Sequence, residues 1–123
     1  WDDVPMGTKS FVVTCYDPDA PPGSGWWHWG VVNLPADTRV LTQGFGSGLV
    51  AVPDGVIQTR TDFGKAGYGG AAPPKGETHR YIFTVHALDV ERLDVDEDAS
   101  GAMVGFNVHF HSLASASITA MFS

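Results

Sequence analysis

The sequence predicts a mainly β fold, for three reasons. Fifteen glycines and eight prolines are spread along 123 residues and indicate many turns, which favours strands over a helical bundle. Three segments, residues 9–17, 26–34 and 79–88, are rich in the β-branched and aromatic residues that strands prefer. The length is that of one domain, residues 1–123, and an apolar content of 43% is enough to build a core.

The first strand is expected over residues 9–17. Alternation along this strand places Phe11, Val13 and Cys15 on one face, and Asp17 follows on the same face. The prolines and glycines that come next end the strand. An apolar face therefore finishes in a carboxylate.

The second strand is expected over Trp26 to Leu34, and Pro35 ends it. It opens with three tryptophans around one histidine. Strict alternation divides it into two faces, one with Trp26, His28, Gly30 and Val32 and the other with Trp27, Trp29, Val31 and Asn33.

Residues 42–76 are rich in glycine and are expected to be mostly irregular, with a proline–aspartate–glycine turn signal near the middle. A loop of this length inside a compact domain is usually functional or disordered. Phe45, Phe63 and Tyr68 give the segment apolar anchors, so we expect an ordered loop that shapes a ligand site.

Residues 79–88 give the clearest strand signal, and the acidic residues 89–98 are expected to be solvated. Ser100 is a good N-cap for a helix that runs to about His111. Residues 108–111 also alternate like a strand, and a last strand is expected over residues 115–122. Four large apolar residues recur at helical spacing, namely Met103, Phe106, Phe110 and Leu113.

Charge and cysteine content restrict the class of partner. The formal net charge is −7 and the seven basic residues are scattered, whereas nucleic-acid binding needs clustered Lys and Arg, so no nucleic-acid partner is expected. Cys15 is the only cysteine and is expected to be a buried small hydrophobe, which fits a reducing, cytoplasmic location. No apolar run approaches the roughly 20 residues of a membrane span.

Four residues that are far apart in the chain are predicted to meet at one pocket: Asp17, His28, His79 and Tyr81. A carboxylate at the end of an apolar face needs a partner such as an imidazole N–H, and two histidines each open a strand beside an aromatic residue. Arg80 points away from the face of its two neighbours and is expected to form a structural ion pair. For Asp19 we expect hydrogen bonds with local backbone N–H groups of the turn.

Two further motifs give weaker signals. Gly69-Gly70 and Pro73-Pro74 are able to present backbone N–H groups to an anion from a rigid loop. His109 and His111 form an HxH pair, but their rings diverge on a helix, and no Cys or Glu stands nearby at ligand spacing. No metal and no cofactor are therefore predicted.

In these segments the chain resembles the phosphatidylethanolamine-binding protein (PEBP) family, also called the Raf-kinase-inhibitor-like proteins, and above all its bacterial branch. Three ordered motifs carry the resemblance: Asp17-Pro18-Asp19-Ala20-Pro21, then Trp26-Trp27-His28-Trp29 leading into Val31-Val32-Asn33-Leu34-Pro35, and Gly67 to Tyr81 with its His79-Arg80-Tyr81 ending. Together they cover most of the chain.

The resemblance implies a PEBP-like sandwich of antiparallel sheets with one or two short helices. It implies a pocket for phosphate, acetate or a phospholipid headgroup, and it also implies a homodimer and a kinase or protease as protein partner. The pocket residues that it implies are Asp17, His28, His79 and Tyr81, with Trp26, Gly70 and Pro74 at the walls.

Two departures from the family pattern matter. Family members carry a few dozen residues upstream of the position of Trp1, so the N-terminal segment of the family fold is expected to be absent and a sheet edge to be exposed. Many relatives have a proline where Ala71 stands, so this loop is expected to be less rigid.

Three functions from different classes remain open at this stage. The leading hypothesis is a module that binds a small anion or a phospholipid headgroup and regulates partner proteins. The second is an inhibitor or scaffold that acts on a kinase or protease through its surface. The third is a hydrolase with an Asp17–His28 acid/base dyad, but no nucleophile is evident, so we expect that the protein is not an enzyme.

Overall fold

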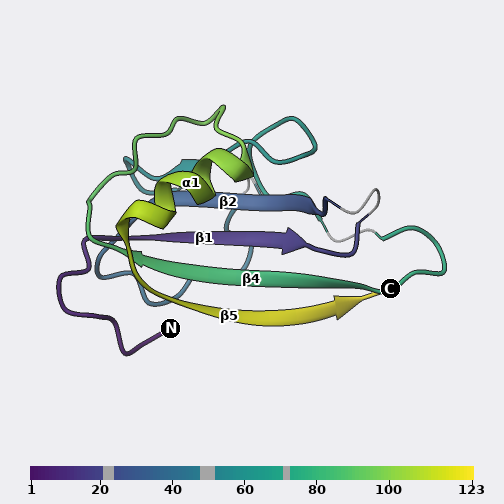
Figure 1. Cartoon of the computed structure of the whole chain (residues 1–123), viewed down its shortest axis with the longest axis horizontal. Coiled ribbons are helices and arrows are strands. Elements are labelled where there is room, and N and C mark those ends of the chain that lie inside the picture. Colours follow the sequence, from purple (N-terminus) through teal and green to yellow (C-terminus); the bar gives the residue numbers. More distant parts are fainter. Residues whose placement is uncertain (21–23, 48–51, 71–72) are drawn as a thin grey trace.

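The computed structural model describes residues 1–20, 24–47, 52–70 and 73–123. The strands in these residues form one antiparallel sheet with the spatial order β3-β2-β1-β4-β5, and α1 lies across one face of it (Figure 1). The prediction of a mainly β fold is therefore confirmed. In chain order the elements are β1 (Ser10–Asp17), β2 (Trp26–Pro35), β3 (Ile57–Gln58), β4 (His79–Leu88), α1 (Gly101–His111) and β5 (Ser112–Phe122).

The predicted elements lie close to the observed ones. β4 has the expected bounds, and α1 follows Ser100, which acts as its N-cap. β1 begins at Ser10, and β2 extends through Pro35. Residues 108–111 are helical, so the alternative of a strand there is wrong, and β5 begins earlier than expected, at Ser112. Sequence reasoning missed β3, a two-residue strand that pairs with the middle of β2.

A β-bulge changes the predicted faces of β2. Cys15 of β1 is opposite Trp29, whereas the next residue, Tyr16, is opposite Trp27, so β2 has one extra residue, His28, at this point. An extra residue of this kind shifts the alternation of the strand. Trp29 and Val31 share the core cluster with Cys15, as their predicted common face requires. The predicted separation of His28 from Trp29 is wrong, because the His28 ring packs on Tyr81 of the same cluster.

A second irregularity lies further along β2. Phe11 is opposite Leu34 and Val13 is opposite Val31, so two residues of β2 lie against one residue of β1. One of the two is Asn33, whose φ of 62° is in the left-handed region that asparagine adopts more readily than most residues. As a result Val31 and Leu34 reach the same core cluster.

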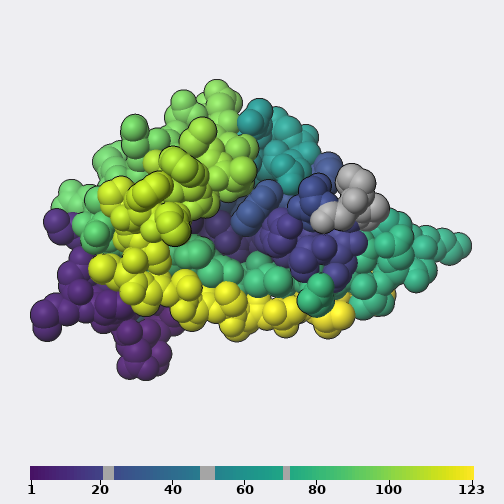
Figure 2. Space-filling view, in the orientation of Figure 1, coloured from purple at the N-terminus to yellow at the C-terminus, as the bar shows by residue number. Residues whose placement is uncertain are grey.

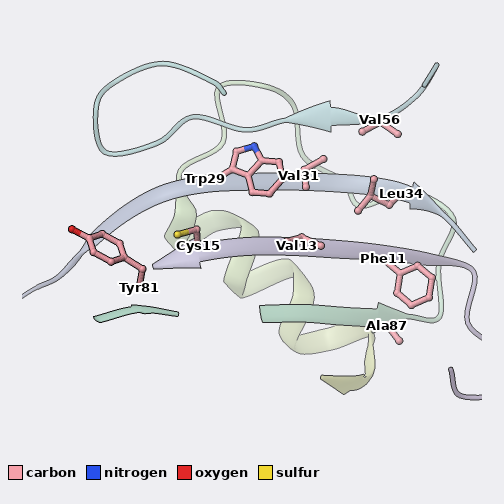
Figure 3. Packing of buried hydrophobic residues seen from close by; sticks show 9 residues of the cluster. All are labelled: Phe11, Val13, Cys15, Trp29, Val31, Leu34, Val56, Tyr81 and Ala87. Carbon is pink, nitrogen blue, oxygen red and sulfur yellow. The ribbon is translucent and has the colours of Figure 1, made fainter. Parts of the chain in front are cut away.

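Each face of the sheet carries a buried apolar cluster, and burial of this kind is the main favourable contribution to folding. On the first face, strand residues pack with Val56 from the segment before β3 (Figure 3), and the cluster consists of Phe11, Val13, Cys15, Trp29, Val31, Leu34, Val56, Tyr81 and Ala87. On the other face, Leu93 from the segment before α1 and Val104 and Val108 from α1 pack against Val12, Val32 and Leu88 of the strands. Figure 3 shows Tyr81 at one end of the first cluster, near the end of β1, with its hydroxyl directed away from the core.

Helix α1 packs through a narrow strip. The Ser100 hydroxyl oxygen accepts a hydrogen bond from the backbone N–H of Met103 at 3.1 Å, which satisfies a donor that the first helical turn leaves free. Val104 and Val108 are buried, whereas Phe106 and Phe110 are exposed. The predicted spacing of large apolar residues therefore identified the helix but not its buried side.

β5 is an edge strand of the sheet and runs along the lower rim in Figures 1 and 2. All its residues are exposed, and Ile118 is the most exposed of its large apolar side chains, at 72%. Among the described residues, no helix has the length and the hydropathy that a membrane crossing requires.

Candidate functional site

A cavity of about 190 Å³ lies where β1 ends and β4 begins. This volume is below the roughly 300–1,000 Å³ of pockets for drug-sized ligands, so the cavity suits a small ligand. Its lining consists of Asp17, Ala20, Trp26, His28, Phe63, Pro73, Pro74, His79 and Tyr81. Of the residues predicted for the pocket, the structure therefore brings together all except Gly70, which is exposed and lines a neighbouring hollow.

The pairing of the strands explains why these residues converge. β1 is antiparallel to both of its neighbours, so its last residue lies beside the first residues of β2 and β4. Asp17 is directly opposite Trp26, and Tyr16 is opposite Ile82. The bulge at His28 keeps this histidine on the cavity side, although Trp29 points into the core on the same side.

Asp17 is 2% exposed, and both of its carboxylate oxygens are engaged. Oδ2 accepts a hydrogen bond from His79 Nδ1 at 2.7 Å, and Oδ1 accepts one from the backbone N–H of Asp19 at 2.7 Å. The turn hydrogen bond that we expected of Asp19 is therefore made by Asp17. The expected imidazole partner of Asp17 is His79, and not the His28 that the hydrolase alternative requires.

Asp19 and Arg80 form an ion pair beside the cavity. Nη2 and Nε of Arg80 lie 2.8 and 3.3 Å from Oδ1 of Asp19, and the backbone N–H of Arg80 donates to Oδ2 at 2.8 Å. These hydrogen bonds lower the pKa of Asp19 to about 2. The prediction of a structural ion pair for Arg80 is confirmed, whereas the prediction of local turn bonds for Asp19 is wrong.

His79 lies between two carboxylates. Its Nδ1 contacts Asp17, and its Nε2 is 2.8 Å from Oε1 of Glu77. An ionised carboxylate only accepts hydrogen bonds, so both ring nitrogens donate, and the geometry is that of an imidazolium. The hydrogen bond with Glu77 and then that with Asp17 raise the pKa of His79 above its ordinary value of 6.5.

His28 fixes the neighbouring loop to β2. Its backbone oxygen accepts from the N–H of Gly69 at 2.9 Å, and its ring Nδ1 lies 2.8 Å from the Gly69 carbonyl oxygen. A carbonyl oxygen only accepts, so Nδ1 carries the proton, and Nε2 has no hydrogen-bond partner in the part of the chain that the structure describes. The N–H of Gly69 is thus engaged, which is a correction to the predicted anion-binding loop, and Ala71 lies outside the described residues.

Three aromatic rings complete the cavity wall. Tyr81 packs edge-on against His28 at 5.2 Å between ring centroids, and Phe63 does the same at 5.4 Å. Burial first, and then the negative charge of Asp17, raise the pKa of the Tyr81 hydroxyl, which therefore keeps its proton. The indole Nε1 of Trp26 is buried without a hydrogen-bond partner among the described residues.

Other chemistry-bearing residues lie elsewhere. His111 contacts Asp89 through Nδ1 at 3.0 Å, and the described residues contain no group of three or more His, Cys, Asp or Glu side chains that could hold a metal ion. Cys15 is fully buried, and burial and the nearby Asp17 raise the pKa of its thiol to about 12, so it is a poor nucleophile.

Sequence reasoning did not assign Glu77 to the site. The signal was present, because Glu77 and His79 are two residues apart, the same spacing that grouped His79 with Tyr81. Phe63 was expected as an anchor of the loop and is also a wall of the cavity. Ala20 and Pro73 carry no chemical signal that would have placed them there.

Comparisons with known proteins agree with one another. The family model described as phosphatidylethanolamine-binding protein matches residues 1–123. The Escherichia coli K12 protein YbhB is 91% identical over 123 residues, which are 100% of this chain and 78% of that protein. YbcL of the same strain is 52% identical and covers 99% of this chain, which spans 68% of YbcL.

Two solved structures are also similar. The crystal structure of Escherichia coli YbcL, described as a new member of the mammalian PEBP family, has a TM-score of 0.89 at 51% identity and covers 100% of this chain and 76% of that one. A putative phosphatidylethanolamine-binding protein homolog from Chlamydia trachomatis has a TM-score of 0.84 at 30% identity, with 99% of this chain and 76% of that one covered.

Proposed function

The chain belongs to the phosphatidylethanolamine-binding protein family, and from this premise we propose that its cavity binds a small oxyanion, either a free ion such as phosphate or acetate or the phosphate of a phospholipid headgroup. The observation that carries the proposal is the set of polar groups around a small cavity. The Tyr81 hydroxyl keeps its proton, and Nε2 of His79 is a hydrogen-bond donor. Nε2 of His28 has no partner among the described residues and becomes a donor when the ring is protonated.

The hydrogen bonds that Asp17 already accepts favour an anion over a cation in the cavity. Asp17 is the one carboxylate among the described residues that line the cavity, and both of its oxygens already accept hydrogen bonds. Its negative charge is balanced by the imidazolium of His79. A cation would therefore find no free acceptor on Asp17, whereas an oxyanion finds donors that need partners.

The expected affinity follows from the number of donors. A hydrogen bond that involves a charged group contributes about 1.5–3 kcal/mol. Two or three such bonds, less the cost of ordering the ligand, correspond to dissociation constants that are roughly millimolar to micromolar.

The pH dependence of phosphate binding tests this proposal. The hydrogen bonds with Glu77 and Asp17 raise the pKa of His79 above its ordinary value of 6.5, so the ring stays cationic near neutral pH and loses its charge as the pH rises further. Affinity for phosphate should therefore fall as the pH is raised above neutral. Calorimetry or ³¹P NMR measures the dissociation constants, with His109→Gln as a control at an exposed histidine of α1. Equal affinity across this range would show that the charge of His79 does not contribute to binding.

Regulation of a protein partner is a separate hypothesis. An inhibitor or scaffold that acts on a kinase or protease through its surface would not need the cavity. Capture of the same partner by wild type, Asp17→Ala and His79→Ala would favour this alternative, whereas loss of capture in both variants would tie the partner to the cavity.

A further inference from the structure

The contact between Glu77 and His79 has the geometry of a bound anion. Glu77 Oε1 accepts from Nε2 of His79 at 2.8 Å, which is the distance of a charge-assisted hydrogen bond. Asp17 holds the other ring nitrogen, so Nε2 is the one N–H of this ring that a ligand oxygen could use. In this structure the acceptor of that N–H is a carboxylate of the chain itself, that of Glu77.

We propose that Glu77 is a built-in competitor for the oxyanion, which binds the Nε2–H of His79 by displacing the Glu77 carboxylate. The inference rests on the proposed oxyanion-binding function and adds the residue that controls the affinity of the same site. The ligand chemistry is a phosphate or carboxylate oxygen. Acetate carries the same functional group as the Glu77 side chain and competes for the same donor.

The charges of the three residues favour a competitive role. With Asp17 and Glu77 both ionised and His79 cationic, the group carries one net negative charge, which opposes an incoming anion. When the Glu77 side chain turns away, a neutral Asp17–His79 pair remains with one free N–H. Displacement therefore removes the repulsion and releases the donor in one step.

The two carboxylates differ in how firmly they are held. The Asp17 side chain is 3% exposed and accepts two hydrogen bonds, whereas the Glu77 side chain is 48% exposed and, among the described residues, contacts His79 alone. Exposed ion pairs are weak, so exchange of Glu77 for another anion costs little. The backbone N–H of Glu77 donates to the Pro74 carbonyl at 3.0 Å, so rotation of the side chain alone is sufficient.

Titrations of matched charge variants test the competitor. Glu77→Gln removes the charge at the site, and Glu91→Gln removes the same charge from an exposed position in the acidic segment 89–98. We expect Glu77→Gln to bind inorganic phosphate about fivefold more tightly than wild type, the scale of an exposed ion pair, and Glu91→Gln to bind as wild type does. Glu77→Ala also removes the amide oxygen that could still accept from Nε2, so it should tighten binding at least as much.

A second arm uses the water-soluble headgroup sn-glycero-3-phosphoethanolamine. Tighter binding of both ligands by Glu77→Gln supports the competitor for a lipid headgroup as well as for a free ion, and tighter binding of phosphate alone supports it for the free ion. Unchanged affinity for both ligands, with binding still measurable, would overturn the competitor and leave the proposed function intact. No binding of either ligand by any variant would overturn both.

The contact between Glu77 and His79 can also be tested without ligand, through the pKa of His79. The groups around His79 are Asp17 from β1, Glu77 from the segment before β4, the Asp19–Arg80 pair, and His28 and Tyr81 in the cavity wall. Among them Glu77 makes the largest contribution to the raised pKa of His79. An NMR titration of the ring should therefore give a lower midpoint in Glu77→Gln than in wild type, and an equal midpoint would show that the carboxylate does not hold Nε2 in solution.

Discussion

Replacement of His28 by asparagine or by glutamine would distinguish the roles of its two ring nitrogens, Nδ1 and Nε2. The amide nitrogen of asparagine reaches about as far as Nδ1, so His28→Asn keeps a donor for the Gly69 carbonyl but has no group at the position of Nε2. The amide nitrogen of glutamine reaches about as far as Nε2, so His28→Gln keeps a donor toward the cavity and loses the bond to Gly69. Only the first change should abolish the proposed contact with the ligand.

The expected size of the effect follows from one lost hydrogen bond. A hydrogen bond to a charged oxyanion contributes about 1.5–3 kcal/mol, and each 1.4 kcal/mol is tenfold, so His28→Asn should weaken phosphate binding roughly 10- to 100-fold. His28→Gln should lose less, because it retains a neutral donor. Calorimetry near pH 6 measures the constants, and urea unfolding checks that each variant is folded.

The control for this series is His109→Asn, which makes the same change at an exposed position on α1. Wild-type affinity in His28→Asn, at an unchanged urea midpoint, would show that Nε2 of His28 does not contact the anion. The proposed site would then rest on the Tyr81 hydroxyl and the Nε2–H of His79.

Two further predictions concern stability. Asp19 has a folded pKa of about 2 against an ordinary value of 3.8, so its pairing with Arg80 stabilises the fold above about pH 4, and this contribution is lost as the pH falls toward 2. The difference in unfolding free energy between wild type and Asp19→Asn should therefore shrink over that range. A constant difference would contradict the pairing. Ser100→Ala removes the N-cap of α1 and should lower the free energy of unfolding by about 1 kcal/mol in urea titrations, whereas Ser24→Ala, at an exposed turn position, should leave it unchanged.

Local signals predicted the elements of the fold well. Strand β4 is bounded by turns and has a dense run of β-branched and aromatic residues, and α1 has a cap residue and a helical period, so neither needs information from distant parts of the chain. The faces of β2 could not be predicted in the same way. They depend on two bulges, and a bulge is a property of how β2 pairs with β1, which alternation along one strand does not contain.

The site shows the same division between local and distant information. Residue types and faces identified Asp17, His28 and His79 as polar groups at strand ends, and the antiparallel register brings all three to one cavity. Which imidazole contacts Asp17 depends on distances of a few ångström between residues 62 positions apart, and these are set by the packed sheet. Glu77 was missed because a charged residue next to a loop is normally interpreted as solvated surface, and only the structure identifies its partner, His79.

The two carboxylates on His79 lead to a last prediction, in which position and net charge give opposite answers. Asp17→Asn and Glu77→Gln each remove one negative charge next to the same ring, and each should lower the pKa of His79, because both partners raise it. If net charge alone controlled anion binding, both variants would bind phosphate more tightly. The geometry predicts that Glu77→Gln binds more tightly, because a competitor is gone. Asp17→Asn should bind more weakly, because the buried carboxylate that holds Nδ1 and orients the ring is lost. Phosphate titrations of the two variants under the same conditions decide between the accounts, and tightening in both would show that the positions of the carboxylates do not matter.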